Sequence, residues 1–283
     1  MKILIIGAKG MLGQALVREF SDGNEVLAWD REQIDITDEQ DSRFKIQDSH
    51  PDMVINAAAY NDVDGAESDS RTAKSVNGYA VGNLARTCSS LDVPLIHFST
   101  DYVFDGAKKH GYDENADPLP ISAYGESKFL GEQQLVANTK KYYLIRLSRL
   151  FGPAGGGKQS FVEKMLSLAA KNKTSGEPIS VVDEELSSPT YAPDLAKRTH
   201  EIVNGKMEYG IYHCPNSGEV TWYGFALEIF KILKMNVTLK PVQASFFPRP
   251  GKRPAYSILL NTKLEPMRPW QEALREFLAQ VKD

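Results

Sequence analysis

Short apolar runs rich in β-branched residues recur through the first 150 residues of the chain. They lie at residues 3–6, 25–29, 53–56, 94–99 and 142–146. Strands that are buried on both faces of a parallel sheet have this pattern. Apolar side chains at helical spacing follow the first run, as at Leu12, Leu16 and Phe20, and residues 78–91 form a further helical stretch. The alternation predicts an α/β fold with a doubly wound parallel sheet of the Rossmann type.

Beyond residue 150 this alternation loosens. A proline-rich basic loop occupies residues 248–254. We expect strands at 179–182 and 210–213 and a helix at 222–233, all in a second unit. The sequence therefore predicts a Rossmann domain over residues 1–150. A smaller C-terminal α/β domain takes most of residues 151–283, and some of its segments return to the Rossmann domain.

Three glycines follow the first apolar run directly. Gly7, Gly10 and Gly13 stand between that strand and the first predicted helix. An isolated triplet is more often an ordinary tight turn, but a strand, glycines and a helix in this order present a helix N-terminus to a pyrophosphate. Asp30 ends the second predicted strand, near the place where an acid accepts hydrogen bonds from an adenosine ribose. These features predict a dinucleotide site.

A tyrosine and a lysine stand four residues apart further along. Tyr124 and Lys128 share one face if this segment is helical. A nearby cation favours the phenolate, so the pair suits proton transfer near neutral pH. Taken alone, such a pair is more often a solvated surface feature. Together with the glycine turn, it predicts a nicotinamide-dependent oxidoreductase.

The strand pattern also predicts where the chemistry lies. Ligands of doubly wound sheets bind beyond the carboxyl ends of the strands. That edge would carry Gly7, Asp30 and residues 56–59, 99–102 and 146–149.

Composition narrows the class of protein. The 283 residues are 42% hydrophobic and carry a formal net charge of −4. That charge argues against nucleic acid or an anionic membrane as a partner. We expect a cytoplasmic protein, because there is no basic and apolar leader and no apolar run of membrane-spanning length. Cys88 and Cys214 are expected to be reduced, and the scattered histidines predict no metal site.

Several motifs resemble those of a known family. Residues 7–13, 56–59, 99–104 and 124–128 are similar to the extended short-chain dehydrogenases/reductases. Further motifs resemble the dTDP-4-dehydrorhamnose reductase branch of that superfamily; they lie at residues 63–67, 182–190, 210–213, 221–222 and 253–254. The similarity covers nearly the whole chain.

The resemblance implies a catalytic set of Thr100, Tyr124 and Lys128. Tyr124 would deliver a proton to a sugar C4 carbonyl, Lys128 would hold the nicotinamide ribose, and Thr100 would hydrogen-bond the reacting oxygen. Side chains alternate along a strand, so we favour Thr100 over Ser99 as the catalytic hydroxyl.

The implied cofactor is NADPH or NADH. Asp30 favours NADH, while Arg31 and Lys9 offset its repulsion of a 2′-phosphate, so use of both is expected. The expected cofactor-binding residues are Gly7, Lys9, Gly10, Met11, Leu12, Gly13, Asp30, Arg31, Asp35, Ile36, Ala57, Ala58, Ala59, Tyr60, Ser99, Tyr124 and Lys128.

The implied substrate is a nucleotide sugar. The expected substrate-binding residues are Thr100, Asp101, Tyr102, Arg149 and Arg253. Position 149 departs from the family pattern, since an arginine stands where the rhamnose-forming reductases have a tryptophan that packs on the sugar. Arg253, with Arg249 and Lys252 beside it, would hold the pyrophosphate.

The reaction we expect is reduction of the C4 keto group of dTDP-4-dehydrorhamnose to give dTDP-L-rhamnose, a precursor of cell-surface polysaccharides. Related 4,6-dehydratases carry Asp-Glu after the threonine, whereas this chain has Asp101 and Tyr102, which disfavours dehydration. A 4-epimerase and a reductase of another 4-ketosugar remain open. So does a non-catalytic NADP-binding regulatory subunit resembling the β subunit of methionine adenosyltransferase.

The assembly expected is a monomer or a homodimer. Gln14 and Ala15 provide no carboxylate where some family members use glutamates in a Mg²⁺-linked dimer. No metal-linked interface is therefore expected.

Overall fold

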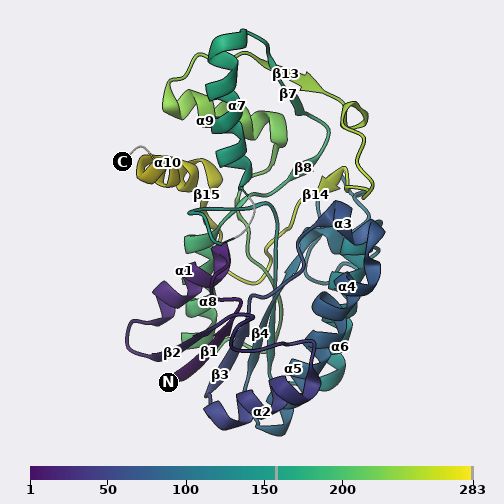
Figure 1. The fold of residues 1–283 in the computed structure, drawn as a ribbon, viewed down its shortest axis with the longest axis vertical. Coiled ribbons are helices and arrows are strands. Elements are labelled where there is room, and N and C mark those ends of the chain that lie inside the picture. Colours follow the sequence, from purple (N-terminus) through teal and green to yellow (C-terminus); the bar gives the residue numbers. More distant parts are fainter. Residues whose placement is uncertain (157–158, 282–283) are drawn as a thin grey trace.

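A computed structural model describes residues 1–156 and 159–281. Its centre is a six-stranded parallel sheet in the order β10-β5-β4-β3-β1-β2 (Figure 1). The strands are β1 (Lys2–Ile6), β2 (Glu25–Trp29), β3 (Met53–Asn56), β4 (Leu95–Thr100), β5 (Tyr142–Leu147) and β10 (Gly210–His213). The predicted doubly wound α/β fold is confirmed, and the five strands expected before residue 150 all form.

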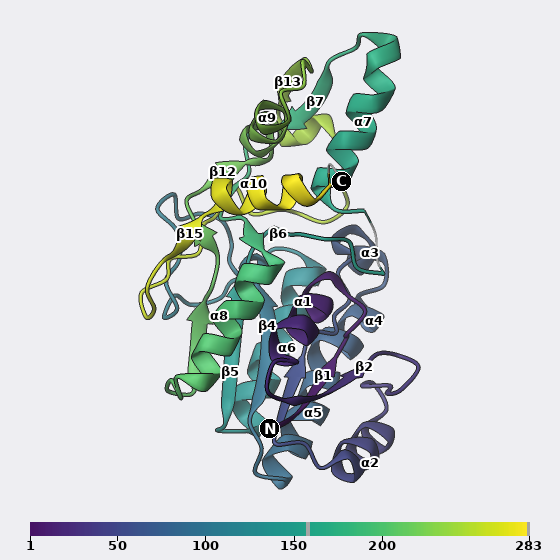
Figure 2. The same ribbon diagram turned by 90° about the vertical axis from the view of Figure 1, so that its left-hand side faces the viewer.

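Helices cover both faces of this sheet (Figures 1 and 2). One face packs against α1 (Met11–Phe20) and α8 (Ala192–Asn204). The other packs against α2 (Glu39–Ser49), α5 (Ala80–Ser90) and α6 (Ala123–Asn138). Because both faces are covered, the strands are mostly apolar, and buried polar residues such as Asn56, Thr100 and Arg146 lie toward their carboxyl ends. Asp38 and Ser122 cap the N-termini of α2 and α6 by accepting hydrogen bonds from backbone N–H groups.

The remaining elements gather at one end of the long axis (Figure 1). Their helices are α7 (Phe161–Ser175), α9 (Trp222–Leu233) and α10 (Trp270–Val281). Their strands are β6 (Leu150–Phe151), β7 (Ile179–Val182), β8 (Leu186–Ser187), β9 (Thr190–Tyr191), β11 (Asn216–Ser217), β12 (Val220–Thr221), β13 (Leu239–Val242), β14 (Tyr256–Ser257) and β15 (Met267–Pro269). An aromatic core that includes Phe151, Phe225 and Trp270 joins the helices of this part. Two short helices, α3 (Val63–Ser68) and α4 (Ser70–Lys74), follow β3 in the Rossmann part.

The structure corrects one strand assignment. The strand at residues 210–213 was expected in the C-terminal unit, but β10 pairs in parallel with β5 at the edge of the central sheet. α8 packs beside α1 and carries the chain back to that edge. An apolar run predicts a strand, but its period does not specify which sheet the strand joins.

Candidate active site

The glycine turn lies at the point where the strand order reverses, between β1 and β3. Gly7 has φ +80°, and a Cβ added to it would lie 2.6 Å from the Ala58 nitrogen. A Cβ on Gly13 would lie 2.0 Å from the Gly7 carbonyl oxygen. Both positions therefore require glycine, which brings the N-terminus of α1 close to β1 and to the segment after β3. The backbone of Gly155 and Gly156 lies against this turn, where the Gly156 N–H donates to the Lys9 carbonyl at 2.9 Å. This geometry fits the predicted dinucleotide.

Asp30 is held by the backbone on both of its carboxylate oxygens. They accept hydrogen bonds from the N–H groups of Lys9 and Arg31, at 3.0 and 2.9 Å. The Lys9 ammonium lies 2.6 Å from a carboxylate oxygen of Glu32, which the sequence interpretation did not include. Because Glu32 neutralises Lys9, Lys9 offsets the repulsion between Asp30 and a 2′-phosphate less than the sequence predicted.

The segment after β3 is fixed by an asparagine that the sequence interpretation also missed. The Asn77 side chain accepts a hydrogen bond from the Tyr60 N–H at 2.8 Å and donates to the Tyr60 carbonyl at 2.9 Å. It also donates to the Ser127 hydroxyl of α6 at 2.9 Å. Residues 57–60 are thus tied to the helix that carries Tyr124. Only the combined geometry identifies Asn77, because no motif marks it.

Two other predicted cofactor residues serve the loop after β2. Ile36 is buried in the core on the α5 side. Asp35 accepts hydrogen bonds from the N–H and the hydroxyl of Thr37. Their described contacts are therefore within the protein.

The three predicted catalytic side chains come together at the carboxyl end of β4. Thr100 ends this strand, and its hydroxyl lies near the phenol of Tyr124 at the start of α6, where it lowers the pKa of that phenol against the effect of burial. The Lys128 ammonium, one turn further along α6, donates to the Phe98 carbonyl at 2.7 Å. A Cβ on Gly125 would lie 2.3 Å from the Tyr102 carbonyl oxygen, so glycine lets α6 approach the turn after β4 closely.

The expected effect of Lys128 on Tyr124 is wrong in this structure. Burial raises the pKa of Tyr124, the Thr100 hydrogen bond lowers it, and the Asp101 charge raises it further. Burial lowers the pKa of Lys128 to about 8, against an opposing effect from the Glu132 carboxylate. Desolvation dominates because both groups are buried, and the ammonium is engaged by a carbonyl.

Asp101 lies beneath the catalytic cluster and is 2% exposed. Its carboxylate accepts hydrogen bonds from the hydroxyls of Thr100, Ser148 and Ser187 at 3.1, 2.8 and 3.2 Å. Burial raises the pKa of Asp101, and hydrogen bonds from Ser257, Ser148 and Thr100 oppose that rise together with the Arg149 charge. The contacts support a role in orienting Thr100. Tyr102 packs edge-on to Tyr124, with ring centroids 5.7 Å apart.

Ser99 differs from its neighbour in its contacts. Its hydroxyl is buried and has no hydrogen-bond partner among the residues that the structure describes. The contact between Thr100 and Tyr124 thus favours Thr100 as the hydroxyl that takes part in the chemistry.

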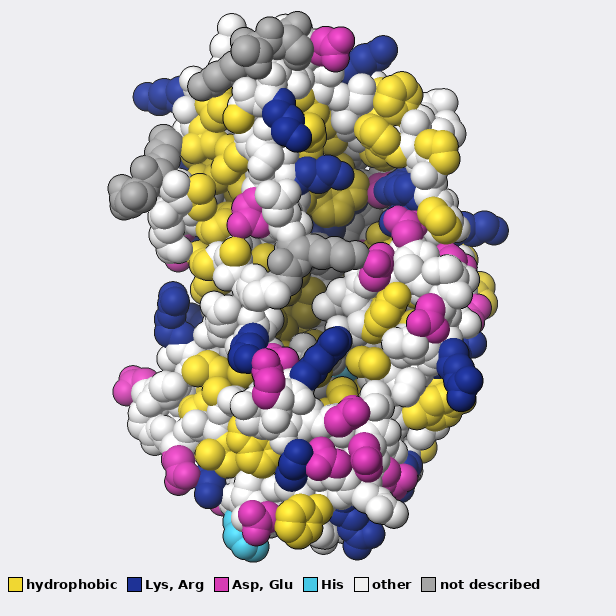
Figure 3. Space-filling model, in the orientation of Figure 1, with side chains coloured by type: hydrophobic (Ala, Val, Ile, Leu, Met, Phe, Trp, Pro, Cys, Tyr) yellow, Lys and Arg dark blue, Asp and Glu magenta, His cyan; other side chains and the backbone are white. Residues whose placement is uncertain are grey.

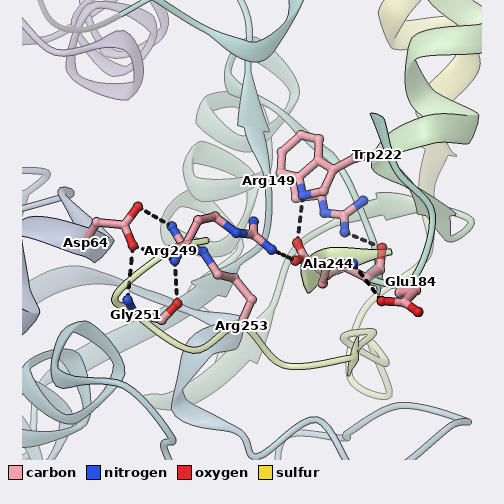
Figure 4. Close-up of polar contacts among 9 residues, drawn as sticks. Asp64, Arg149, Glu184, Trp222, Ala244, Arg249, Gly251 and Arg253 are labelled. Carbon is pink, nitrogen blue, oxygen red and sulfur yellow. Dashed lines mark hydrogen bonds and ion pairs between the residues drawn. The ribbon is translucent and has the colours of Figure 1, made fainter. Parts of the chain in front are cut away.

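Arginines from separate segments of the chain come together with Asp64 and Trp222 (Figure 4). We call Arg149, Arg249 and Arg253 the guanidinium cluster. The Arg149 guanidinium lies 4.2 Å from the Trp222 ring centroid and donates to the Val220 carbonyl at 2.7 Å. Its φ of 43° is unusual for a residue other than glycine. The side chain expected to touch the sugar is therefore part of a stacked pair with Trp222.

Two carboxylates neutralise the other members of the guanidinium cluster. Glu185 pairs with Arg249 and accepts a hydrogen bond from the Trp222 indole N–H at 3.1 Å. Asp64, in the first turn of α3, accepts two hydrogen bonds from Arg253 at 2.6 and 2.8 Å. The Arg253 hydrogen bonds hold the pKa of Asp64 at about 2. Asp64, Glu185 and Trp222 stand in motifs noted above, yet the sequence assigned them no contact.

The molecule is hollowed between its two parts, and Lys and Arg side chains stand at the margin of the hollow (Figure 3). Within residues 1–156 and 159–281, no group of three or more His, Cys, Asp or Glu side chains is placed to hold a metal ion. No helix in the same ranges has the length and apolar character needed to cross a membrane.

The family model described as RmlD substrate binding domain matches residues 1–283. The chain belongs to this family. A dTDP-4-dehydrorhamnose reductase of Mycolicibacterium smegmatis is 36% identical, over 99% of this chain and 86% of its own length. A probable dTDP-4,6-dihydroxy-2-methyloxan-3-one 4-ketoreductase of Streptomyces antibioticus is 37% identical, over 98% of this chain and 94% of its own.

A solved member of the family has nearly the same fold. The dTDP-4-dehydrorhamnose reductase of Bacillus anthracis, crystallised in complex with NADP, superposes with a TM-score of 0.93 at 33% identity over 99% of both chains. The predicted reductase branch of the extended dehydrogenases is thereby confirmed.

Proposed function

We propose that this chain catalyses the NADPH-dependent reduction of the C4 keto group of dTDP-4-dehydrorhamnose to give dTDP-L-rhamnose. The observation that carries the proposal is the meeting of Thr100, Tyr124 and Lys128 at the sheet edge that also holds the glycine turn. Relatives of similar length carry this reductase name, and a solved relative binds NADP.

The side chains would act as follows. NADPH, held over the glycine turn, would supply the hydride that reaches the sugar C4. Tyr124 would donate its phenolic proton to the C4 oxygen. Its raised pKa keeps it protonated beforehand, and the Thr100 hydroxyl fixes its direction. Lys128, on the same face of α6, would hold the nicotinamide ribose.

A reductase of another dTDP-linked 4-ketosugar is the second candidate. The arginine at position 149, stacked on Trp222, departs from the tryptophan of the rhamnose-forming enzymes. A relative of equal similarity bears the name of a different 4-ketoreductase. The sugar is therefore the feature to be tested first.

The test is a panel of dTDP-, UDP- and GDP-4-ketosugars with NADPH or NADH, followed at the nicotinamide absorbance and by product NMR. We expect dTDP-4-dehydrorhamnose to be reduced fastest, with L-rhamnose stereochemistry. An epimerase would instead release tightly held NAD and interconvert sugars without net oxidation. A regulatory subunit would bind NADPH, reduce nothing and co-purify with a synthetase.

The charge of the proposed ligands bears on where in the cell the chain acts. Both the dinucleotide and the nucleotide sugar carry several charges and do not cross a bilayer unaided. This supports a cytoplasmic site of action, with the chain as a monomer or homodimer. Size-exclusion chromatography with light scattering distinguishes the two assemblies.

A further inference from the structure

Two members of the guanidinium cluster are neutralised in different ways. In the pair of Arg249 and Glu185, the side chains are 25% and 6% exposed. In the pair of Arg253 and Asp64, they are 12% and 38% exposed. The carboxylate is thus buried in the first pair and open to water in the second.

Glu185 is a fixed partner. Its two carboxylate oxygens meet Arg249 and the Trp222 indole N–H, respectively. Moving it away from Arg249 would leave a buried carboxylate without its cation, which is strongly destabilising. Arg249 is therefore committed to the protein.

Asp64 is an exchangeable partner. Its carboxylate can turn into water at little cost, since more than a third of the side chain is exposed. Arg253, by contrast, is largely buried. Its charge would be left without a partner if Asp64 moved away and no other anion took its place. Another anion that approaches from the solvent side can therefore replace Asp64.

The position of the Arg253 guanidinium indicates which anion would replace Asp64. The loop carrying Arg253 lies on α3, where the Gly251 N–H donates to Asp64 at 3.1 Å. Burial raises the pKa of Tyr102, whose ring packs on that of Tyr124, and the nearby charge of Arg253 opposes that rise. The guanidinium, which faces Asp64 and the Gly251 carbonyl (Figure 4), thus lies near the ring that packs on Tyr124, on the side where the anionic part of a nucleotide sugar would be held.

We propose that Asp64 is an internal competitor of the substrate, which occupies Arg253 until the diphosphate of the nucleotide sugar replaces it. The exchange keeps Arg253 paired in both states and lowers the affinity for the diphosphate, which favours product release. The inference rests on the proposed function only in that the substrate carries a diphosphate.

The experiment measures binding of dTDP to the NADPH-loaded full chain by titration calorimetry. Asp64→Asn removes the charge but keeps an oxygen for the Gly251 N–H. We expect its Kd for dTDP to fall about threefold to fivefold, the range given by loss of one partly exposed ion pair. Asp69→Asn, a matched change of charge at the N-cap of α4, should leave the Kd within about 1.5-fold, as for a screened remote charge.

A double-mutant cycle decides the mechanism. In an Arg253→Ala background, Asp64→Asn should no longer lower the Kd for dTDP, because Asp64 then has no guanidinium to pair with. An unchanged or weaker Kd in Asp64→Asn alone would overturn the proposal, and so would tightening that persists without Arg253. Thermal denaturation checks folding, and Asp64→Ser serves as the second variant if the asparagine destabilises the chain.

The cycle needs no turnover, so its outcome is separate from that of the proposed function. If the wild-type chain reduces 4-ketosugars but the cycle shows no coupling, only the role of Asp64 fails. If no ketosugar is reduced while the cycle shows coupling, only the assigned reaction fails.

Discussion

The catalytic cluster and the guanidinium cluster are built on different scaffolds. Thr100 ends a central strand, and Tyr124 and Lys128 lie on the helix packed against it. Arg149 and Arg253 come from irregular segments, and the partner of Arg253 stands 189 residues away in sequence. The residues that would transfer a proton are held by a strand and a helix, which fix their distances. The residues that would bind a charged group are held by loops.

The two clusters also differ in whether a buried cation has a carboxylate partner. Lys128 is desolvated within the Rossmann part, so its pKa falls to about 8. Arg253 has its own carboxylate, which raises its pKa. Substitutions in the first cluster should therefore reduce turnover, and substitutions in the second should change substrate affinity. The predictions below test this division.

The largest effect is expected from Tyr124→Phe. Loss of the proton donor should lower kcat by about 10² to 10⁴, while the Kd for NADPH stays near the wild-type value. Tyr209→Phe, an exposed tyrosine at the far end of the molecule, is the control. Steady-state kinetics and calorimetry give both quantities, and more than about a tenth of wild-type kcat would exclude Tyr124 as the acid.

Lys128→Met should reduce both turnover and NADPH affinity, because it removes a ribose contact as well as a charge. Lys128→Met should also change how the free energy of unfolding depends on pH. The folded pKa of about 8 lies below the ordinary 10.5, so the unfolded chain binds more protons between these values. The contribution of Lys128 to the free energy of unfolding therefore rises with pH through this window.

Denaturant titrations at several pH values measure that dependence. The wild-type free energy of unfolding minus that of Lys128→Met should rise by about 1 to 3 kcal/mol across the window. A flat difference would show that Lys128 is solvated in solution.

Arg253→Ala is expected to act only on the substrate side. Loss of its contact to the diphosphate should raise KM about tenfold, equivalent to about 1.4 kcal/mol of binding, with NADPH affinity unchanged. Lys240→Ala, at an exposed position of β13, should change KM by less than about twofold, as for a screened surface charge. Wild-type KM in Arg253→Ala would place the diphosphate elsewhere.

The smallest effect is expected from Asp30→Ala. Removing its charge should shift the ratio of kcat/KM values toward NADPH by about threefold to fivefold, the range of one exposed charge interaction. Glu32→Gln should shift it the same way, since Lys9 is then released from its 2.6 Å ion pair. Asp22→Ala is the surface control, and an unchanged ratio in Asp30→Ala would remove that residue from the cofactor site.

The sequence predicted the catalytic cluster much better than the guanidinium cluster. The helix spacing of Tyr124 and Lys128 and the strand end at Thr100 are local features, and the structure brings the three together. The pairing of Asp64 with Arg253 depends on how a late loop crosses α3. No periodicity carries that information.

The sequence by itself determined the parallel sheet, the glycine turn and the family, because apolar runs and turn residues act over a few positions. Tertiary structure decided that β10 joins β5, that desolvation raises the pKa of Tyr124, and that Arg149 stacks on Trp222. These outcomes depend on burial and on contacts between distant segments, and neither is set by local pattern.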